Sequence, residues 1–509
     1  MRKIYLFIFI LFAKSLFASG INLSNSTVSF KVSSGVNLKL NYPISNVKGT
    51  IIKESGSVIS GGSISIENGC FNEVNSESKI NGLLDFSGTQ KIYLTGNSIL
   101  EGKRGDIFSY IVISGQDNII QGNLNTLNDI DIQDGDSSVV INTHVRLDKN
   151  INLNGGEIKL GDDLHFLDDK RIIGPGLINL NSHRLSFGAK DLYWTENILF
   201  KDAADLEINS SLILDASWIF SGDSIICGNS NIIYLDSVDS ILVRPNSTLL
   251  IRDAILYGVS ENKLRCMADN SIISFQNTKI VLDNDFSFTV GSLIFGDNVE
   301  FIGKDKVFHY QSSMTSTIKD NAMVTLSNGV TFSYAPISGR DNLLYFEADD
   351  STIYLNGANL YTAYTGLNLL GGRIIADKNS EILIESRDWV HATVTGTYLD
   401  EGITYSYYDY TYGHSGYLNI GNNSEESDFE LEILSGAQLN FVTGDLYYKN
   451  VGAQSFKAFN EFSTLSFFAG TGLILYQDLT ISPGKIVFNR SSRFEAQEGK
   501  KLFGSRFYV

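Results

Sequence analysis

The sequence predicts an all-β fold, specifically an elongated right-handed parallel β-helix, in which the chain winds strand after strand into a single-stranded β-solenoid. Three observations lead to this prediction: a recurring unit of polar turn and strand, a second recurring signature of Gly-Gly-x-Ile, and a shortage of proline. Only 5 of the 509 residues are Pro. This suits a chain made largely of paired strands, since Pro has no N–H to donate to a ladder.

The recurring unit is clearest between Asp269 and Leu282, where a polar turn leads into an alternating strand, a small kink and a second short strand. Alternation of this kind places one set of side chains on a buried face. Two further versions of the unit span 245–258 and 349–362. The predicted inward positions are Ser271, Ile273, Phe275, Thr278 and Ile280, then Ser247, Leu249, Ile251, Ala254 and Leu256, then Ser351, Ile353, Leu355, Ala358 and Leu360.

The second signature begins at Gly61, Gly155 and Gly371. Its glycine pair supplies a turn in which a side chain would clash, and the strand that follows is predicted to turn Ile158 and Leu160 toward the core. The copies start 94 and 216 residues apart, close to multiples of about 24 residues, the scale of one solenoid coil. We therefore expect about 20 coils, with insertions where the spacing is uneven.

Two other all-β folds are disfavoured. A β-sandwich would be built from hairpins and would use two-residue Asn-Gly or Asp-Gly turns more often than this chain does. A β-propeller would show a blade-length repeat of four strands with a fixed motif, and no such repeat is visible in the sequence.

The N-terminus predicts export. Met1-Arg2-Lys3 is basic, Ile4 to Ala13 is an apolar run, and small residues follow at Ala18-Ser19-Gly20. This is the pattern of a secretory signal peptide, and the apolar run is too short to cross a membrane. We expect a signal peptide at 1–19, a solenoid at 20–390, a projecting Tyr-rich insertion at 391–428, and final coils with a cap at 429–509. The predicted location is secreted or cell-surface, with no transmembrane segment after cleavage.

The formal net charge of −18 and the pI near 4.8 disfavour binding to nucleic acid or to anionic membrane surfaces, which need basic patches. Cys70, Cys227 and Cys266 are too few for a disulfide framework; we expect small buried side chains, with a bridge between Cys227 and Cys266 left open. The histidines show no metal-ligand spacing along the sequence, so neither a metal site nor a cofactor is expected; they are His144, His165, His183, His309, His391 and His414.

A tyrosine-rich segment is the candidate ligand-binding surface. On a strand, tyrosines two residues apart share a face and offer flat rings with hydroxyl groups to a sugar or a protein. The alternative is a structural clasp, in which one row of rings packs on the solenoid wall. The candidate residues are Trp389, Tyr405, Tyr407, Tyr408, Tyr410 and Tyr412.

A second candidate is the tripeptide Arg104-Gly105-Asp106, which lies in a polar stretch and reads as an exposed turn. It resembles the integrin-binding tripeptide of adhesive proteins, which implies a role in adhesion.

Two short stretches resemble known β-helix proteins. The run from Arg171 to Ile178 is similar to the I-x-G-x-G-x-I rung of secreted right-handed β-helices, including pectin-degrading enzymes and bacterial surface passengers. It covers one coil and implies architecture alone; the chain as a whole matches no specific family.

The series Asn142-Thr143-His144, Gly161-Asp162-Asp163 and Ser182-His183-Arg184 resembles the order of polygalacturonase motifs. However, His144 stands where that family has a carboxylate, and His183 lacks both flanking glycines. Asp162 and Asp163 are therefore expected to be turn residues rather than catalytic groups.

These features favour a secreted or cell-surface structural or adhesive module without catalytic activity, with a surface glycan or a host or cell-surface protein as partner. The alternative is a protein that binds or degrades polysaccharides, as a lyase or hydrolase, on the same scaffold. An enzyme would gather acidic and basic side chains from adjacent coils into one groove, whereas a scaffold would leave its faces evenly polar.

Overall fold

The structure is a computed structural model. It describes residues 21–508 except 23–28, 34–35, 41–43, 48–49, 54–57, 62–63, 68–69, 74–90, 96–98, 103–105, 108–109, 125, 128, 148, 189, 261, 364–365, 386, 401–402, 416, 422, 424–427, 451–455, 459, 482 and 505–506. It gives only the backbone for some strands, including those within 387–415. The expected signal peptide and Arg104-Gly105 lie outside the described residues.

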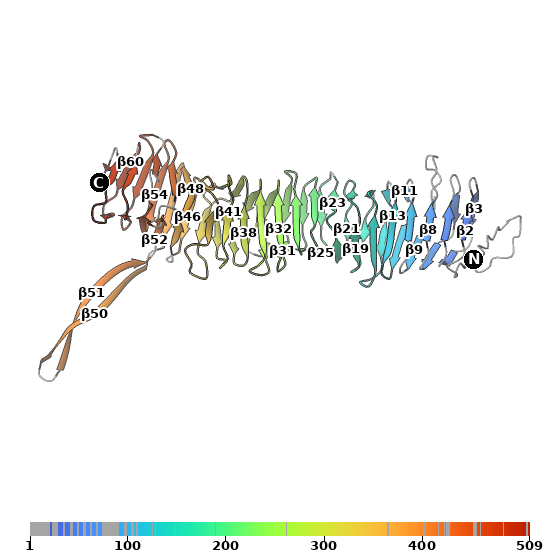
Figure 1. Ribbon diagram of the computed structural model, residues 1–509, viewed down its shortest axis with the longest axis horizontal. Coiled ribbons are helices and arrows are strands. Elements are labelled where there is room, and N and C mark those ends of the chain that lie inside the picture. The colour runs from blue at the N-terminus through green and yellow to red at the C-terminus, as the bar shows by residue number, and fades with distance from the viewer. Residues whose placement is uncertain are drawn as a thin grey trace. The chain divides into compact units, whose positions relative to one another are not determined.

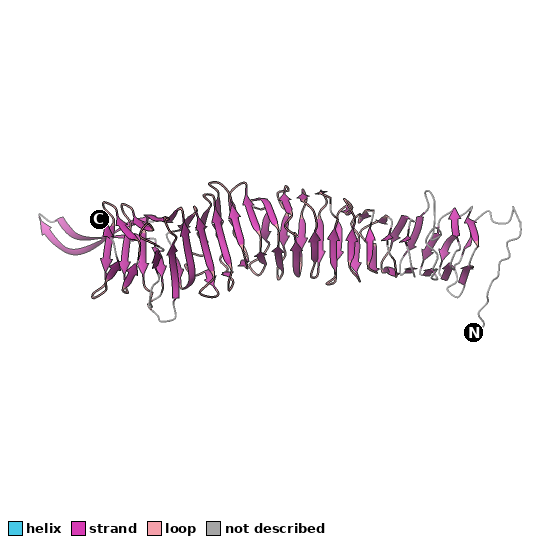
Figure 2. Ribbon diagram, turned by 90° about the horizontal axis from the view of Figure 1, so that it is seen from above, coloured by secondary structure: helices cyan, strands magenta, loops and turns pink. Residues whose placement is uncertain are grey.

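The described chain is a parallel β-solenoid, as predicted, and it contains no helix (Figures 1 and 2). Each complete coil contributes three short strands, and each strand pairs in parallel with the equivalent strands of the preceding and following coils. The fold divides into two compact units, Met1–Ala254 and Ile255–Val509, which we call unit 1 and unit 2. The described residues include no helix long and apolar enough to span a membrane.

In unit 1, three successive coils carry the strands that matter for function. They are β15 (Ile130–Ile132), β16 (Ser138–Asn142) and β17 (Val145–Leu147); β18 (Ile151–Asn152), β19 (Glu157–Leu160) and β20 (Leu164–Phe166); and β21 (Ile172–Ile173), β22 (Gly176–Asn179) and β23 (Arg184–Phe187), with β26 (Asp205–Ile208) in the coil after them. Val145 pairs with Leu164, and Leu164 with Leu185. Equivalent residues thus recur every 19 to 21 positions here, a little below the expected coil length.

In unit 2 the relevant coils are β45 (Thr352–Asn356), β46 (Asn359–Thr362) and β47 (Leu367–Leu369); β48 (Gly371–Asp377), β49 (Asn379–Ile384) and β52 (Tyr417–Ile420); and β53 (Asp428–Ile433), β54 (Gln438–Thr443) and β55 (Asp445–Tyr448), followed by β58 (Gly472–Leu475). Coil length varies along the chain, since Ile111 pairs with Ile130 but Met323 with Thr352. The expectation of uneven coils is confirmed.

The core is the inward face of the strands. All the inward positions predicted from the three copies of the repeat are buried, and so are Ile158 and Leu160. Stacking of equivalent coils brings like side chains together: in unit 2, Phe288 stacks on Tyr310 and Tyr310 on Tyr334, with ring centroids 6.4 and 5.7 Å apart. The third glycine pair differs from the prediction, because Gly371 and Gly372 begin β48 itself, and a Cβ on Gly372 would lie 2.3 Å from Phe346 Cδ1.

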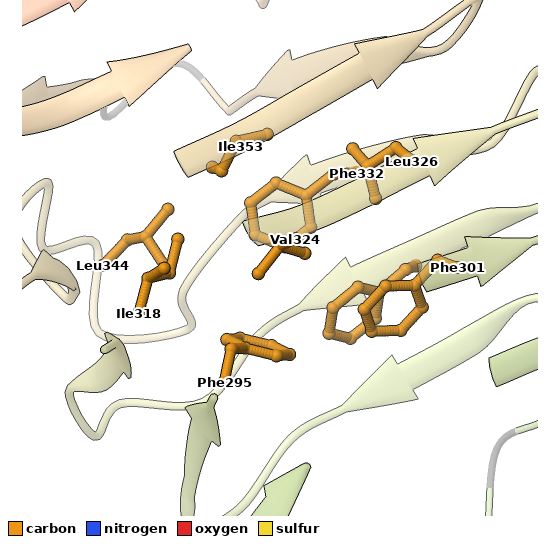
Figure 3. A pocket seen from close by; sticks show the side chains of 9 residues that line it. Phe295, Phe301, Ile318, Val324, Leu326, Phe332, Leu344 and Ile353 are labelled. Carbon is orange, nitrogen blue, oxygen red and sulfur yellow. The ribbon is translucent and has the colours of Figure 1, made fainter. Parts of the chain in front are cut away.

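Figure 3 shows a gap within the core of unit 2, enclosed by apolar side chains such as Phe295, Phe332 and Leu344. Its volume is about 10 Å³, no more than one water needs, and an apolar lining offers water no partner. This gap is a packing defect and not a ligand site.

Buried serines fasten one coil to the next at the turns. In unit 1, Ser247 Oγ accepts a hydrogen bond from the Gly222 N–H at 2.9 Å; in unit 2, Ser316 Oγ accepts from the Leu293 N–H at 2.8 Å. Ser351 Oγ donates to the Lys319 carbonyl at 2.9 Å. Each bond satisfies a buried polar group that would otherwise destabilise the fold, which explains why a serine opens each copy of the repeat.

The described cysteines, Cys227 and Cys266, are free thiols, so the bridge left open by the sequence is not formed. Cys266 is buried, and its desolvation raises the pKa of its thiol to about 12. The Cys70 side chain lies outside the described residues.

We predict that Phe275→Asp destabilises unit 2 by several kcal/mol, because it places an unpaired carboxylate where a fully buried ring stacks on Phe295. Ser274→Asp is the matched control, since the neighbouring Ser274 is only partly buried and faces outward; it should shift stability little. Thermal and urea unfolding measure both. Equal melting temperatures for the two variants would contradict the inward assignment.

Candidate functional site

A long hairpin is inserted into unit 2 between β49 and β52. It consists of β50 (Arg387–Asp400) and β51 (Ile403–Ser415), which pair antiparallel and form a separate two-stranded sheet. In Figure 1 the hairpin points away from the coils. The predicted insertion at 391–428 therefore corresponds to strands that begin at Arg387, while the solenoid resumes at Tyr417.

The solenoid continues across this insertion without interruption. β47 pairs with β52, so that Leu367 lies opposite Leu418 although 50 residues separate them in the chain. β48 and β49 pair with β53 and β54 in the same way. The hairpin is thus an addition at one corner of a coil, and the coils on both sides pair as if it were absent.

The candidate tyrosines fall on both faces of the hairpin. Tyr408, Tyr410 and Tyr412 lie opposite Val394, Ala392 and Val390, and residues directly opposite in an antiparallel pair share a face. Tyr405, Tyr407 and Trp389 belong to the other face, with Tyr405 opposite Tyr398, Tyr407 opposite Gly396 and Trp389 opposite Gly413. One face therefore combines three tyrosines with three small or branched apolar residues, and the other is mixed.

A cluster of rings lies on the coils from which the hairpin leaves. We call Tyr417, Tyr447, Lys449 and Tyr476 the root cluster. The ring centroids of Tyr417 and Tyr447 are 6.0 Å apart and those of Tyr447 and Tyr476 are 6.1 Å apart, both edge to face. Lys449 Nζ lies 5.4 Å from the Tyr447 centroid and 5.3 Å from the Tyr476 centroid, within the range of cation–π attraction.

Polar groups from an earlier coil complete this surface. Tyr417 Oη donates to Asp341 Oδ2 at 3.0 Å, and Asn368 Nδ2 donates to the same oxygen at 2.6 Å. Asn419 Nδ2 donates to Asn368 Oδ1 at 2.6 Å. The Asn419 side chain is buried, and its Oδ1 has no hydrogen-bond partner among the described residues.

Burial shapes the ionisation of this surface. Desolvation, reinforced by the hydrogen bond to Asp341, raises the pKa of Tyr417 to about 12. Desolvation also lowers the pKa of Lys449. The surface thus combines partly buried aromatic rings, amides and one cation, a set that suits a sugar ring or the polar edge of a protein.

Sequence reasoning missed the root cluster, because its members come from different coils. A usable signal was present, since Tyr417, Tyr447 and Tyr476 recur at intervals of 30 and 29 residues. That interval matches the local coil length, because Tyr417 pairs with Asp445 and Asp445 with Gly472.

The structure also brings together residues from the three motifs that resemble the polygalacturonase series. His144, Asp162, Asp163 and His183, which we call the corner cluster, lie at one corner of three successive coils, just before β17, β20 and β23. His144 Nδ1 is 3.9 Å from Asp162 Oδ1, and His183 Nδ1 is 3.9 Å from Asp163 Oδ1. Asp162 and Asp163 are turn residues, as expected, but they are also neighbours of two imidazoles.

Local backbone structure fixes these positions. Gly161 allows close stacking, since a Cβ there would lie 2.7 Å from Asn142 Oδ1. Before His183 the chain makes a tight turn, in which Asn181 and Ser182 have positive φ and the His183 N–H donates to the Leu180 carbonyl. The Arg184 N–H donates to Asp163 Oδ1 at 2.8 Å, holding that carboxylate toward the next coil.

Of the tripeptide Arg104-Gly105-Asp106, the structure describes only the backbone of Asp106, which begins β11 (Asp106–Ile107) and pairs with Thr126. No family model, curated protein or solved structure matches the chain. The resemblance to β-helix proteins is therefore one of architecture alone.

We predict a pH signature for Tyr417. Because its pKa is raised in the folded protein from an ordinary value of 10.0 to about 12, the unfolded chain loses this proton first, and stability falls as the pH rises between these values. The stability difference between the native protein and Tyr417→Phe should be constant below about pH 10 and shrink up to about pH 12. Chemical denaturation at several pH values measures it, and a constant difference throughout would refute the assignment.

Proposed function

We propose that the protein is an exported, cell-surface adhesive module without catalytic activity, in which the solenoid is a rigid support and the hairpin with the root cluster is the contact surface. The observation that carries this proposal is the continuous strand pairing across the hairpin. An element that the coils do not need for their own pairing is free to serve recognition, and rigid scaffolds with inserted loops commonly bind in this way.

The chemistry of the contact surface supports recognition rather than reaction. β51 alone carries five tyrosines, and Tyr398 of β50 lies opposite one of them, Tyr405. Tyrosine provides a large contact area at a low cost in side-chain entropy. Lys449 and Asp341 add charges of both signs beside the rings of the root cluster.

Export rests on the N-terminal pattern of a basic start, an apolar run and small residues. The acidic net charge of −18 fits a partner that is neutral or carries basic groups, and disfavours nucleic acid. We propose a surface glycan or a cell-surface protein as the partner.

Removal of the hairpin tests this proposal. Replacing 386–416 by Gly-Gly leaves four residues between Ile384 and Leu418, the same number as between their partners Thr362 and Leu367. We expect the shortened protein to keep its melting temperature within a few degrees, because every solenoid strand retains its partners. It should lose binding to immobilised neutral and acidic polysaccharides and to intact cells.

Two point variants refine the test. Tyr408, Tyr410 and Tyr412 changed together to Ser alter one face of the hairpin, and Tyr405 with Tyr407 changed to Ser alter the other; loss of binding in only one variant identifies the contact face. Soluble product released from any polysaccharide would contradict the non-catalytic proposal. Undiminished binding by the hairpin-free protein would contradict the assigned surface.

A further inference from the structure

We propose that the corner cluster of unit 1 binds one divalent transition-metal ion of the Zn²⁺ class, through the imidazole of His183 and the carboxylates of Asp162 and Asp163, with His144 at the rim. This site is independent of the proposed contact surface. Nothing in the spacing of these residues along the sequence indicates it, because the donors come from three coils.

The geometry permits a common ion. One donor atom from each of Asp162, Asp163 and His183 lies within 4.8 Å of the other two. Donor atoms around one tetrahedral Zn²⁺, each about 2.0 to 2.2 Å from it, are about 3.3 to 3.6 Å apart. The observed distance of 3.9 Å from His183 Nδ1 to Asp163 Oδ1 therefore closes with a side-chain movement of less than about 1 Å.

The donor set selects the class of ion. A nitrogen donor together with carboxylate oxygens suits Zn²⁺ and related first-row ions, whereas Ca²⁺ and Mg²⁺ prefer oxygen ligands only. His144, with 66% of its side chain exposed, can supply a second nitrogen. Because all the donors are partly or largely exposed, coordination positions remain open to water or to a ligand from outside.

The surrounding charges leave room for a cation. Arg184 is the nearest cation in sequence, but its guanidinium is engaged by the next coil: Nε lies 3.1 Å from Asp205 Oδ2, and Nη1 lies 3.5 Å from Glu207 Oε2. In the described part of the chain, the ion-pair partners of Asp162 and Asp163 are the two imidazoles. A bound dication would offset the repulsion between these adjacent carboxylates.

The experiment is metal binding to the full chain after chelator treatment. Zn²⁺ is titrated against a competing chromophoric chelator, and Co²⁺ is added separately to record its visible absorption bands. We expect about one equivalent of Zn²⁺ per chain. Asp163→Asn and His183→Ala should each weaken binding at least about tenfold, as loss of even an outer-shell partner does in established sites.

The controls separate this site from general surface binding. His309→Ala and Asp349→Asn each remove one donor of the same type from unit 2 and should bind Zn²⁺ like the native protein. Asp163→Asn keeps the oxygen that accepts the Arg184 N–H, so it decides the case if His183→Ala folds poorly. The proposal is overturned if the native protein binds no Zn²⁺, if both site variants bind as well as the controls, or if Ca²⁺ binds in preference to Zn²⁺.

Discussion

In-register stacking of parallel coils is the constraint on which the rest of the structure depends. Strands one coil apart lie about 4.8 Å from each other, so each side chain rests on its equivalent in the next coil. Inward positions must therefore pack as columns, as Phe166 does on Phe187 in unit 1 and Phe441 on Phe467 in unit 2. The serines at the turns obey the same rule, because their hydroxyl groups bond to the backbone of a neighbouring coil.

The same constraint decides where functional groups can lie. Corners and outward faces are the positions that tolerate polar and charged side chains, and a residue there gains neighbours from coils about 20 to 30 positions away. The corner cluster and the root cluster both arise in this way. The hairpin is a third consequence, since a corner can accept a long insertion while the strands on each side keep their partners.

Inward positions were predictable from the sequence, because alternation within each repeat identifies them without knowledge of coil length. Phe275 and Leu355 are buried as expected. Outer sites were not predictable, because they depend on which residues of different coils align. His144, Asp163 and Arg184 align at intervals of 19 and 21 residues, whereas the tyrosines of the root cluster recur at 30 and 29. The excursion around the tyrosines was predicted, but its paired strands extend further toward the N-terminus than the composition indicated.

The central claim is that a self-sufficient solenoid carries the hairpin as an added element. Amide hydrogen exchange of the intact protein tests it most directly. An isolated two-stranded hairpin is marginally stable, so β50 and β51 should exchange quickly, while β48, β49, β52 and β53 should be protected as strongly as the other coils of unit 2. Protection of β50 and β51 equal to that of the coils, or fast exchange in β52, would contradict this account.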